Sequence, residues 1–348
     1  MSHPYADLPA TAFWRSAVAG TAPEALEGIA APKFRLDGQS AIATAGSCFA
    51  QHVGRALRAA GLNVLDAEPA PPKCPPQVAR DYGYGIYSAR YGNIYSTRQL
   101  LQLLQDAMGD VVDPAAIWPR GRRFHDALRP TIEPDGFASP QEAVALRHTH
   151  LGKLRDLFQR ATHFVFTLGL TECWADRESG RVYPTCPGVV AGAFDPARHV
   201  FMNLGWPEVM ADLTAVRDLL RGLNPDLRMI LTVSPVPLTA TASGQHVLQA
   251  STASKAILRA AAGAFAEAHE DVDYFPSYEI VTNPAAGGRF FAPNLREVTA
   301  EGVAAAMQAF LAAHGVAERA SSAPVALDED VDLGDVICEE ILLEAFRK

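Results

Sequence analysis

The sequence lacks the features that mark a membrane or exported protein. Its 348 residues contain no apolar run as long as a membrane span. The start of the chain, MSHPYADLPATAFWRSAVAG, has no basic stretch followed by an apolar segment, which a signal peptide would need. We therefore expect a cytoplasmic protein with no membrane partner.

Positive charge and paired cysteines are also scarce. The chain has 30 Lys and Arg against 39 Asp and Glu, a net charge of -9. Binding of nucleic acid needs clustered positive charge, so nucleic acid is not an expected partner. The five cysteines are scattered and form no C-x-x-C pair, which argues against a zinc site and a disulfide framework. No His, Asp and Glu cluster has the spacing of metal ligands, so neither a metal nor a cofactor is expected.

One stretch of the chain, residues 40–57, carries the strongest local signal. Residues 41–45 are small and apolar, which predicts a short buried strand. Phe49, Val53 and Leu57 follow at four-residue spacing, which predicts one apolar face of a helix. The sequence therefore predicts a strand, an abrupt turn and a helix, with Gly46, Ser47 and Cys48 at the turn.

A hydroxyl and a thiol at this turn are candidates for a nucleophile. Backbone N–H groups and the positive end of the helix dipole favour an anion at a helix N-terminus. We expect the Cys48 thiol to have a pKa below its usual value for this reason. The alternative is that Cys48 is a small buried packing residue, as most free cysteines are.

Strands and helices alternate along the chain. Residues 41–45, 62–65, 162–168, 227–233 and 271–275 are expected to be strands, and several are apolar on both faces. Helices are expected at about residues 97–108, 140–160, 207–223, 246–269 and 299–314. This alternation predicts an α/β fold, a parallel sheet between two helix layers.

The chain divides into three parts in this interpretation. Residues 1–38 form an N-terminal arm packed on the core, 39–316 form the α/β domain, and 317–348 form an acidic C-terminal tail. We expect a short helix with Phe13, Trp14 and Val18 to anchor the arm. The stretch at 66–96 is expected to be a long irregular loop, 109–140 a mixed covering segment, and 175–205 a second long excursion rich in Gly and Pro. The tail is expected to be peripheral, flexible or a docking element for a partner.

Polar residues follow several of the predicted strands. Thr171 and Glu172 follow one strand, Ser234 follows the next, and Glu279 comes after the last. Ligands of parallel sheets bind beyond the carboxyl ends of the strands, so these residues are expected to meet Cys48 there. The alternative is that they are ordinary helix caps, because S/T-x-x-E is also a capping signature.

Seven motifs then give a resemblance that covers residues of about 10 to 312. They are GSCFA at 46–50, YGNIYS at 91–96, FTLGLTECW at 166–174, TVSPVPL at 232–238, SKAILRA at 254–260, YFPSYEI at 274–280 and NLREVTAEGV at 294–303. Together they resemble the GSCFA-domain family. That family is similar to the SGNH/GDSL hydrolases, which are three-layer α/β/α proteins that cleave or transfer acyl esters. The resemblance implies a mostly parallel, flavodoxin-like sheet.

The resemblance also implies roles for individual residues. The SGNH nucleophile falls on Cys48, with Ser47 at the place of the neighbouring Asp, and the choice between the two stays open. Gly92 and Thr171 fall on the positions that stabilise the oxyanion.

The last block of the SGNH pattern, Asp-x-x-His, falls on Asn294 and Glu297. A one-turn spacing would put both on one face, pointing at the site. Glu297 could take the nucleophile's proton if burial raised its pKa. His246 and His52 are alternative bases, and His199, in the 175–205 stretch, is a third.

We expect Glu172, Ser234, Glu279 and Asn294 to bind the substrate. The expected function is hydrolysis of an acyl ester or thioester. The alternatives are an acyltransferase that acts on a glycan or small-molecule hydroxyl, and a non-catalytic ligand-binding protein with a degenerate site. The expected partner is an acyl substrate, with acyl-CoA as one candidate donor.

Overall fold

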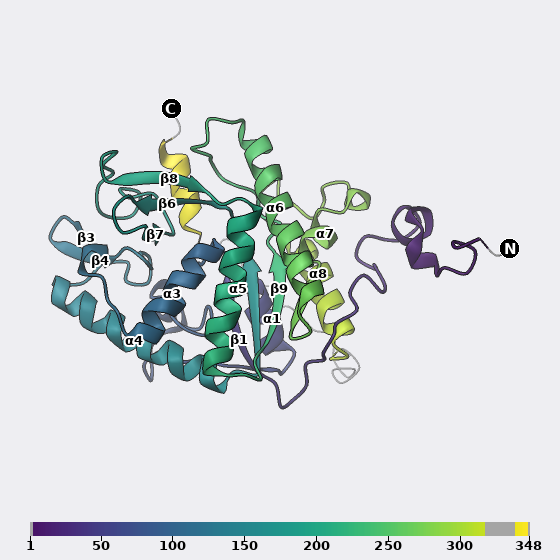
Figure 1. Cartoon of the computed structure of the whole chain (residues 1–348), viewed down its shortest axis with the longest axis horizontal. Coiled ribbons are helices and arrows are strands. Elements are labelled where there is room, and N and C mark those ends of the chain that lie inside the picture. The colour runs from purple at the N-terminus through teal and green to yellow at the C-terminus, as the bar shows by residue number, and fades with distance from the viewer. Residues whose placement is uncertain (1–2, 317–337, 347–348) are drawn as a thin grey trace.

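The computed structural model describes residues 3–316 and 338–346, and a five-stranded parallel sheet lies at its centre (Figure 1). The strands are β1 (Ala41–Gly46), β2 (Asn63–Val64), β5 (His163–Leu168), β9 (Arg228–Val233) and β10 (Val272–Phe275). Their order is β10-β9-β5-β1-β2, and every neighbouring pair is parallel. All five were expected from the sequence, and the α/β architecture with a flavodoxin-like strand order is confirmed.

Both faces of the sheet are buried. Phe164 and Phe166 of β5 pack into one apolar cluster, while Val165 between them packs into another. Successive side chains of a strand point to opposite faces, so a strand with apolar residues at every position needs cover on both sides.

Helices supply that cover. The helices α3 (Thr97–Gly109), α4 (Pro140–Arg160), α5 (Trp206–Leu223) and α6 (Val247–Ala268) bury their apolar residues with Phe164 and Phe166. The helices α1 (Ala50–Ala59), α7 (Ser277–Val281) and α8 (Ala300–Ala313) bury theirs with Val165. Hydroxyls of Ser96, Ser139 and Thr299 accept a backbone N–H at the starts of α3, α4 and α8.

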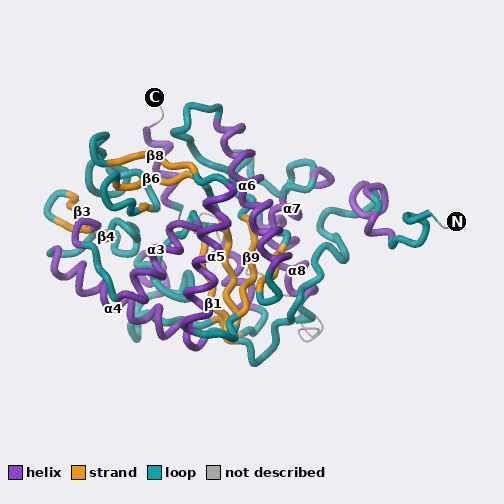
Figure 2. Tube along the Cα trace, viewed as in Figure 1, coloured by secondary structure: helices purple, strands orange, loops and turns teal. Residues whose placement is uncertain are grey.

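Two small antiparallel sheets lie outside the central one (Figure 2). One is a hairpin of β3 (Ile117–Arg120) and β4 (Arg123–Asp126), and the other joins β6 (Glu172–Asp176), β7 (Val182–Tyr183) and β8 (His199–Asn203). No strands were expected from the sequence in 109–140 or 175–205, and the structure has them in both stretches. These strands have only two to five residues, with Gly and Pro between them, so no apolar run marks them.

Short helical turns complete the described chain. They are the helix α2 (Pro76–Asp81), a π-helix at Arg15–Ala19, and 3-10 helices at Ala10–Ala12, Pro114–Ala116, Pro284–Ala286 and Glu339–Phe346. Among the helices of residues 3–316 and 338–346, none combines the length and apolar character that a membrane crossing requires.

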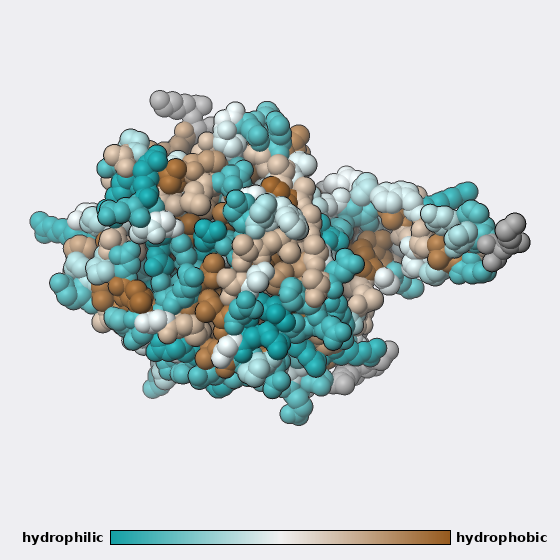
Figure 3. Space-filling model, in the orientation of Figure 1, coloured by the Kyte–Doolittle hydropathy of each residue, from teal (hydrophilic) through white to brown (hydrophobic). Residues whose placement is uncertain are grey.

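The N-terminal arm reaches away from the body (Figure 3). A short helix forms at Arg15–Ala19, but Phe13 and Trp14 are 41% and 66% exposed, so they do not anchor it. The later part of the arm makes the contact instead. Leu26 and Ile29 pack on the cluster of α8, and the buried Phe34 belongs to that cluster.

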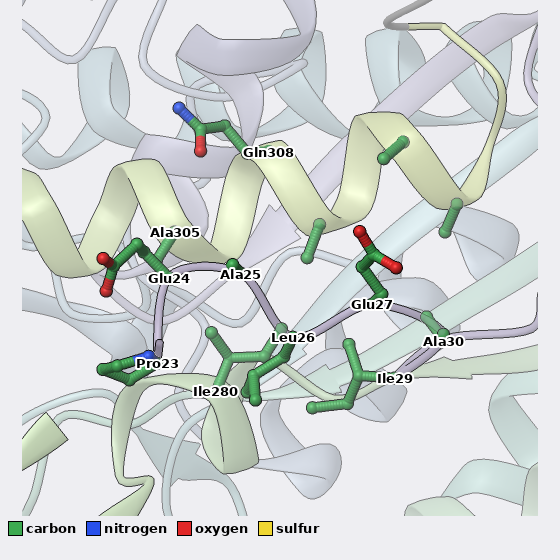
Figure 4. Close-up of a pocket in the computed structure, with 14 residues that line it drawn as sticks. Pro23, Glu24, Ala25, Leu26, Glu27, Ile29, Ala30, Ile280, Ala305 and Gln308 are labelled. Carbon is green, nitrogen blue, oxygen red and sulfur yellow. The ribbon is translucent and has the colours of Figure 1, made fainter. Parts of the chain in front are cut away.

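A cavity of about 330 Å³ separates part of the arm from α8 (Figure 4). Residues 23–30 form one wall, and Ile280 with the α8 residues from Ala305 onward form the other. The arm is thus held along one helix of the outer layer rather than at its tip.

Residues 338–346 of the C-terminal tail lie beside the central domain, near β6 and β8 (Figure 1). Glu339 and Glu340 are buried. The expectation of a peripheral, flexible or partner-docking tail stays a prediction for this piece. Residues 317–337, the rest of that expectation, lie outside the described residues.

Candidate active site

The turn after β1 lies where the chain leaves the carboxyl end of the sheet. Gly46 has φ of 141°, and a Cβ there would lie 2.4 Å from the carbonyl oxygen of Thr167 on the neighbouring strand. The next residue, Ser47, donates its backbone N–H to that same carbonyl at 3.1 Å. Only glycine allows this approach, because any side chain would collide with backbone.

Ser47 and Cys48 face different surroundings. A Cβ placed on Gly169 would lie 2.8 Å from the Ser47 Cβ, so Ser47 lies tightly against the end of β5. Its hydroxyl is buried and has no hydrogen-bond partner among the described residues. Cys48, by contrast, meets charged groups of α6, of the turn before α8 and of the tail.

The Cys48 thiol has a second thiol, that of Cys338 in the tail, as its main electrostatic neighbour. The influence of Cys338, together with burial, raises the pKa of Cys48 well above its usual value. The influence of Cys48 and of the nearby Arg296 guanidinium lowers the pKa of Cys338 to about 6. The expectation of a readily ionised Cys48 is therefore wrong for this arrangement, because the helix N-terminus is outweighed by burial and a neighbouring thiolate.

Three side chains hold the carboxylate of Glu339 beside Gly92. The Tyr95 hydroxyl donates to Oε2 at 2.7 Å and the Thr131 hydroxyl donates to Oε1 at 2.7 Å. The amide of Asn93 also donates to Oε2. A Cβ placed on Gly92 would lie 3.9 Å from Oε1, so the expected oxyanion residue borders a bound carboxylate.

Two cations lie close to the thiol pair. Arg296 donates to the Glu340 carboxylate at 3.0 Å and to the Cys338 sulfur at 3.6 Å. Burial opposes the charge of Arg296, but Glu340 and Cys338 outweigh it and raise its pKa. Lys255 is buried in α6 and donates to the carbonyl oxygen of Gly169 at 2.7 Å.

Two of the surrounding groups, Lys255 and Glu340, have pKa values that are shifted toward pH 7. Burial lowers the pKa of Lys255 to about 8, while the charges of Glu340 and Cys48 act against that change. Burial and the Cys338 sulfur raise the pKa of Glu340 to about 7. Perturbed groups gathered in one place are typical of functional sites. We call Cys48, Asn93, Tyr95, Lys255 and Arg296 the edge site.

The block that carries Asn294 and Glu297 is arranged differently from the expectation. It forms a turn rather than a helix, and the Asn294 side chain accepts the backbone N–H groups of Arg296 and Glu297. Asn294 and Glu297 are both exposed. Leu295, with φ of 54°, bends the chain so that Arg296 faces the thiols, and Glu297 does not.

None of the three histidines is seen to serve the thiol in this arrangement. His246 is exposed and caps α6, where its ring accepts the N–H of Leu248 at 3.2 Å. His52 packs against Phe49, and burial lowers its pKa to about 3. His199 accepts the backbone N–H of Asp195 at 3.0 Å in the β6–β8 sheet.

Thr171 and Ser234 lie at strand ends, as expected, but their polar groups hold the fold. Thr171 donates its hydroxyl to Asn203 at 2.6 Å and its N–H to Ser254 at 3.0 Å. The hydroxyl of Ser234 accepts the N–H of Val236 at 3.2 Å. Neither residue caps a helix, and these contacts hold the strand ends to neighbouring segments.

The two glutamates expected to bind substrate are in different places. Glu279 accepts from Arg259 and from the Tyr274 hydroxyl, a cluster built from α6, β10 and α7. Glu172 accepts from the Thr241 hydroxyl at 2.7 Å and lines the large cavity described next. Burial raises the pKa of Glu172.

A cavity of about 710 Å³ lies beside the edge site. Leu170, Trp174 and Phe201 form apolar wall, and Glu339 and Glu340 border it from the tail. Its size is within the range of small-molecule sites, which are mostly apolar with a few polar groups.

Sequence reasoning missed Lys255 and Arg296 of the edge site, and it missed Cys338, Glu339 and Glu340 of the tail beside that site. A signal existed for Lys255, because it neighbours Ser254 and Leu258 on the apolar face of a predicted helix. No local pattern predicts that the tail residues lie at this site, because their contacts join positions more than 200 residues apart in the chain. Within residues 3–316 and 338–346, no group of His, Cys, Asp and Glu is arranged to hold a metal ion.

A family model described as the GSCFA family matches residues 41–310, which include the turn at Cys48, Lys255 and Arg296. The search of curated proteins finds no match.

Proposed function

We propose, from the premise that this chain belongs to the GSCFA family, that it transfers acyl groups through the Cys48 thiol. The primary reaction is hydrolysis of an acyl ester or thioester. The resemblance of this family to SGNH/GDSL hydrolases supports the reaction class, and the strand order supports the place of the site.

One observation carries the proposal. A thiol on the strand-to-helix turn shares its surroundings with a buried amine, Lys255, and with a polar cradle that holds a carboxylate beside Gly92. Acyl transfer needs a nucleophile, a proton carrier and donors for an oxyanion, and these three parts correspond to them.

In the proposed mechanism, the neutral amine of Lys255 takes the proton of the Cys48 thiol. The thiolate attacks the carbonyl carbon. The donors beside Gly92, which are Asn93, Tyr95 and Thr131, hold the carbonyl oxygen as it gains negative charge. The bond to the leaving group then breaks, and the Lys255 ammonium returns its proton to the departing oxygen or sulfur. Water attacks the acyl-enzyme, Lys255 takes its proton, and that proton goes back to the Cys48 sulfur.

Lys255 replaces Glu297 and His246 as the proposed base. Its pKa of about 8 leaves part of the amine neutral at physiological pH, whereas an ordinary lysine is almost fully charged. Cys48 is the proposed nucleophile rather than Ser47, because Ser47 lies pressed between the ends of β1 and β5.

The cavity of about 710 Å³ supports an acyl substrate with an apolar portion, which Trp174 and Phe201 would contact. A thioester such as acyl-CoA is one candidate donor in a cytoplasmic protein. The acceptor is water in a hydrolase, and a glycan or small-molecule hydroxyl in the alternative acyltransferase.

The experiment is hydrolysis of a short nitrophenyl ester by the full chain. Cys48→Ala should lower kcat/KM by about 100-fold or more, because the nucleophile is lost. Cys74→Ala is the matched control, since Cys74 is the partly exposed thiol of the 66–96 loop, and it should leave the rate unchanged. Equal rates for both variants and the unaltered protein would contradict the proposal.

A second candidate function, a non-catalytic binding protein, is favoured by one observation. The positions of the Asp-x-x-His block are occupied by Asn294 and Glu297 in an exposed turn, so the SGNH base and its partner are not present there. In that case no variant hydrolyses esters, while a Cys48→Ala protein still binds its ligand.

A further inference from the structure

We propose that the edge site is a receptor for an acidic peptide, and that residues 338–346 are its ligand within the same chain. The segment covers Cys48 while it is seated and exposes Cys48 when it leaves. The inference rests on the proposed function only in treating Cys48 as the group that must become accessible.

The first support is the number of buried donors committed to one side chain. Glu339 is almost fully buried, and Asn93, Tyr95 and Thr131 all donate to its carboxylate. These donors come from two separate loops of the domain. A buried carboxylate is costly unless such donors satisfy it, so the loops provide a binding site for a carboxylate.

The second support is Arg296, which binds the two neighbours of Glu339. It donates to Glu340 at 3.0 Å and to the Cys338 sulfur at 3.6 Å. The Tyr95 hydroxyl contacts the same sulfur at 3.7 Å. Three consecutive tail residues are therefore each held by side chains of the domain, which is specific peptide recognition rather than loose contact.

The third support is the apolar half of the segment. Leu343 and Phe346 border the cavity of about 710 Å³, whose other walls include Trp174 and Phe201. The segment thus combines an acidic start, which meets the donors and Arg296, with an apolar end at the cavity.

Seating and catalysis exclude each other in this arrangement. Cys48 is 6% exposed, and Cys338 of the segment is the group that most affects the pKa of its thiol. The Glu339 carboxylate also occupies the place beside Gly92 that an acyl oxygen would need. A substrate reaches the sulfur only after residues 338–340 have moved.

The experiment measures alkylation of Cys48 by iodoacetamide in the full chain, with mass spectrometry of the Cys48 peptide. Glu339→Lys reverses a buried charge against its donors and should raise the alkylation rate by about 10-fold or more. Glu344→Lys is the matched control, with the same charge change at an exposed position of the same segment, and should leave the rate unchanged. Thr131→Val removes one donor from the receptor side and should also raise the rate.

Two additions make the seated state visible. A synthetic peptide of residues 338–346, added to the Glu339→Lys protein, should restore protection of Cys48. A diazenedicarboxamide oxidant should join Cys48 and Cys338 in the unaltered protein: both thiols lose a proton and an electron, a disulfide forms, and the oxidant is reduced to its hydrazine. The Glu344→Lys protein should form the same link, and the Glu339→Lys protein should form much less.

The inference is overturned if Glu339→Lys and Thr131→Val leave Cys48 as protected as Glu344→Lys does, or if the peptide gives no protection. It is also overturned if Glu339→Lys exposes Cys48 but abolishes ester hydrolysis that the unaltered chain performs, since the segment would then complete the site. If alkylation responds as expected and no variant hydrolyses esters, the receptor stands and the proposed function fails.

Discussion

Lys255 is the residue on which the proposed chemistry of the site depends most. An amine buried in α6 loses the water that stabilises its charge, so burial lowers its pKa to about 8. Its bond to the Gly169 carbonyl fixes the amine at the carboxyl end of β5, on the same edge as Cys48. The same residue therefore has both the position and the proton affinity that the proposed base needs.

At this scale we predict the effect of Lys255→Arg. Arginine retains the positive charge and the donor to Gly169 but stays protonated, so kcat/KM should fall by about 100-fold. Ester hydrolysis by the unaltered protein should become faster as pH rises through about 8, because the neutral amine is the proposed active form, and the variant should lose that rise. Lys153→Arg, at an exposed position of α4, is the control. If Lys255→Arg keeps both the rate and its pH profile, Lys255 is not the base and only holds the Gly169 carbonyl in place.

At the scale of elements, the segment 338–346, the turn at Leu295 and the helix α6 bring charged side chains together around Glu340. The Glu340 carboxylate faces Arg296, Lys255 and the Cys338 sulfur. Burial dominates the balance and raises its pKa from 4.5 to about 7 in the seated state. Seating is therefore linked to the uptake of a proton by Glu340.

The sign of this linkage gives a second prediction. A released Glu340 ionises near its ordinary pKa, whereas the seated one holds its proton up to about pH 7. Raising the pH from about 5 to about 6 should therefore weaken seating and expose Cys48, while Arg296 and Lys255 keep their charge. Above about pH 6 the seated Cys338 thiol, whose pKa is about 6, loses its proton, which favours seating and opposes the effect of Glu340. The measurement is the reaction rate of Cys48 with dithiodipyridine, divided by that of Cys74. Glu340→Gln should flatten this dependence, and a dependence that persists in the variant would contradict the assignment.

The sequence predicts the central elements well because their signals are local. β5 and β9 are apolar at nearly every position, and α4 begins at a Ser with Pro and Glu behind it, so strand and helix could be placed directly. The turn at Cys48 was also predicted. The sheet of β6, β7 and β8 was not, because strands this short have no distinct period.

The candidate site was predicted less completely, for a physical reason. The φ of 54° at Leu295 determines which side chain of the turn at 294–297 faces inward. A positive φ is uncommon for leucine, so the sequence does not predict it. The seating of Glu339 depends on contacts with Asn93 and Thr131, far away in the chain. Neither is encoded in a local pattern.

At the scale of the whole molecule, the arm and the domain differ in how they are held. Phe34 is buried with the cluster of α8, while Trp14 near the tip is 66% exposed. The arm thus contributes to stability through its later half.

A third prediction follows for the free energy of unfolding. Phe34→Ala should lower it by about 3 kcal/mol, since a buried aromatic side chain is removed. Trp14→Ala should change it by less than about 0.5 kcal/mol, because an exposed side chain buries little surface. Urea unfolding followed by circular dichroism measures both. A larger loss for Trp14→Ala than for Phe34→Ala would show that the tip of the arm is the anchor.

The most direct test of the central claim is a mass measurement of the protein after reaction with a short nitrophenyl ester, followed by mapping of the modified peptide. The acyl-enzyme mechanism predicts one acyl group on Cys48, more of it in the Glu339→Lys protein, and none there after Cys48→Ala. Turnover of the ester with no acyl group on Cys48, or with the group only on another residue, would contradict it.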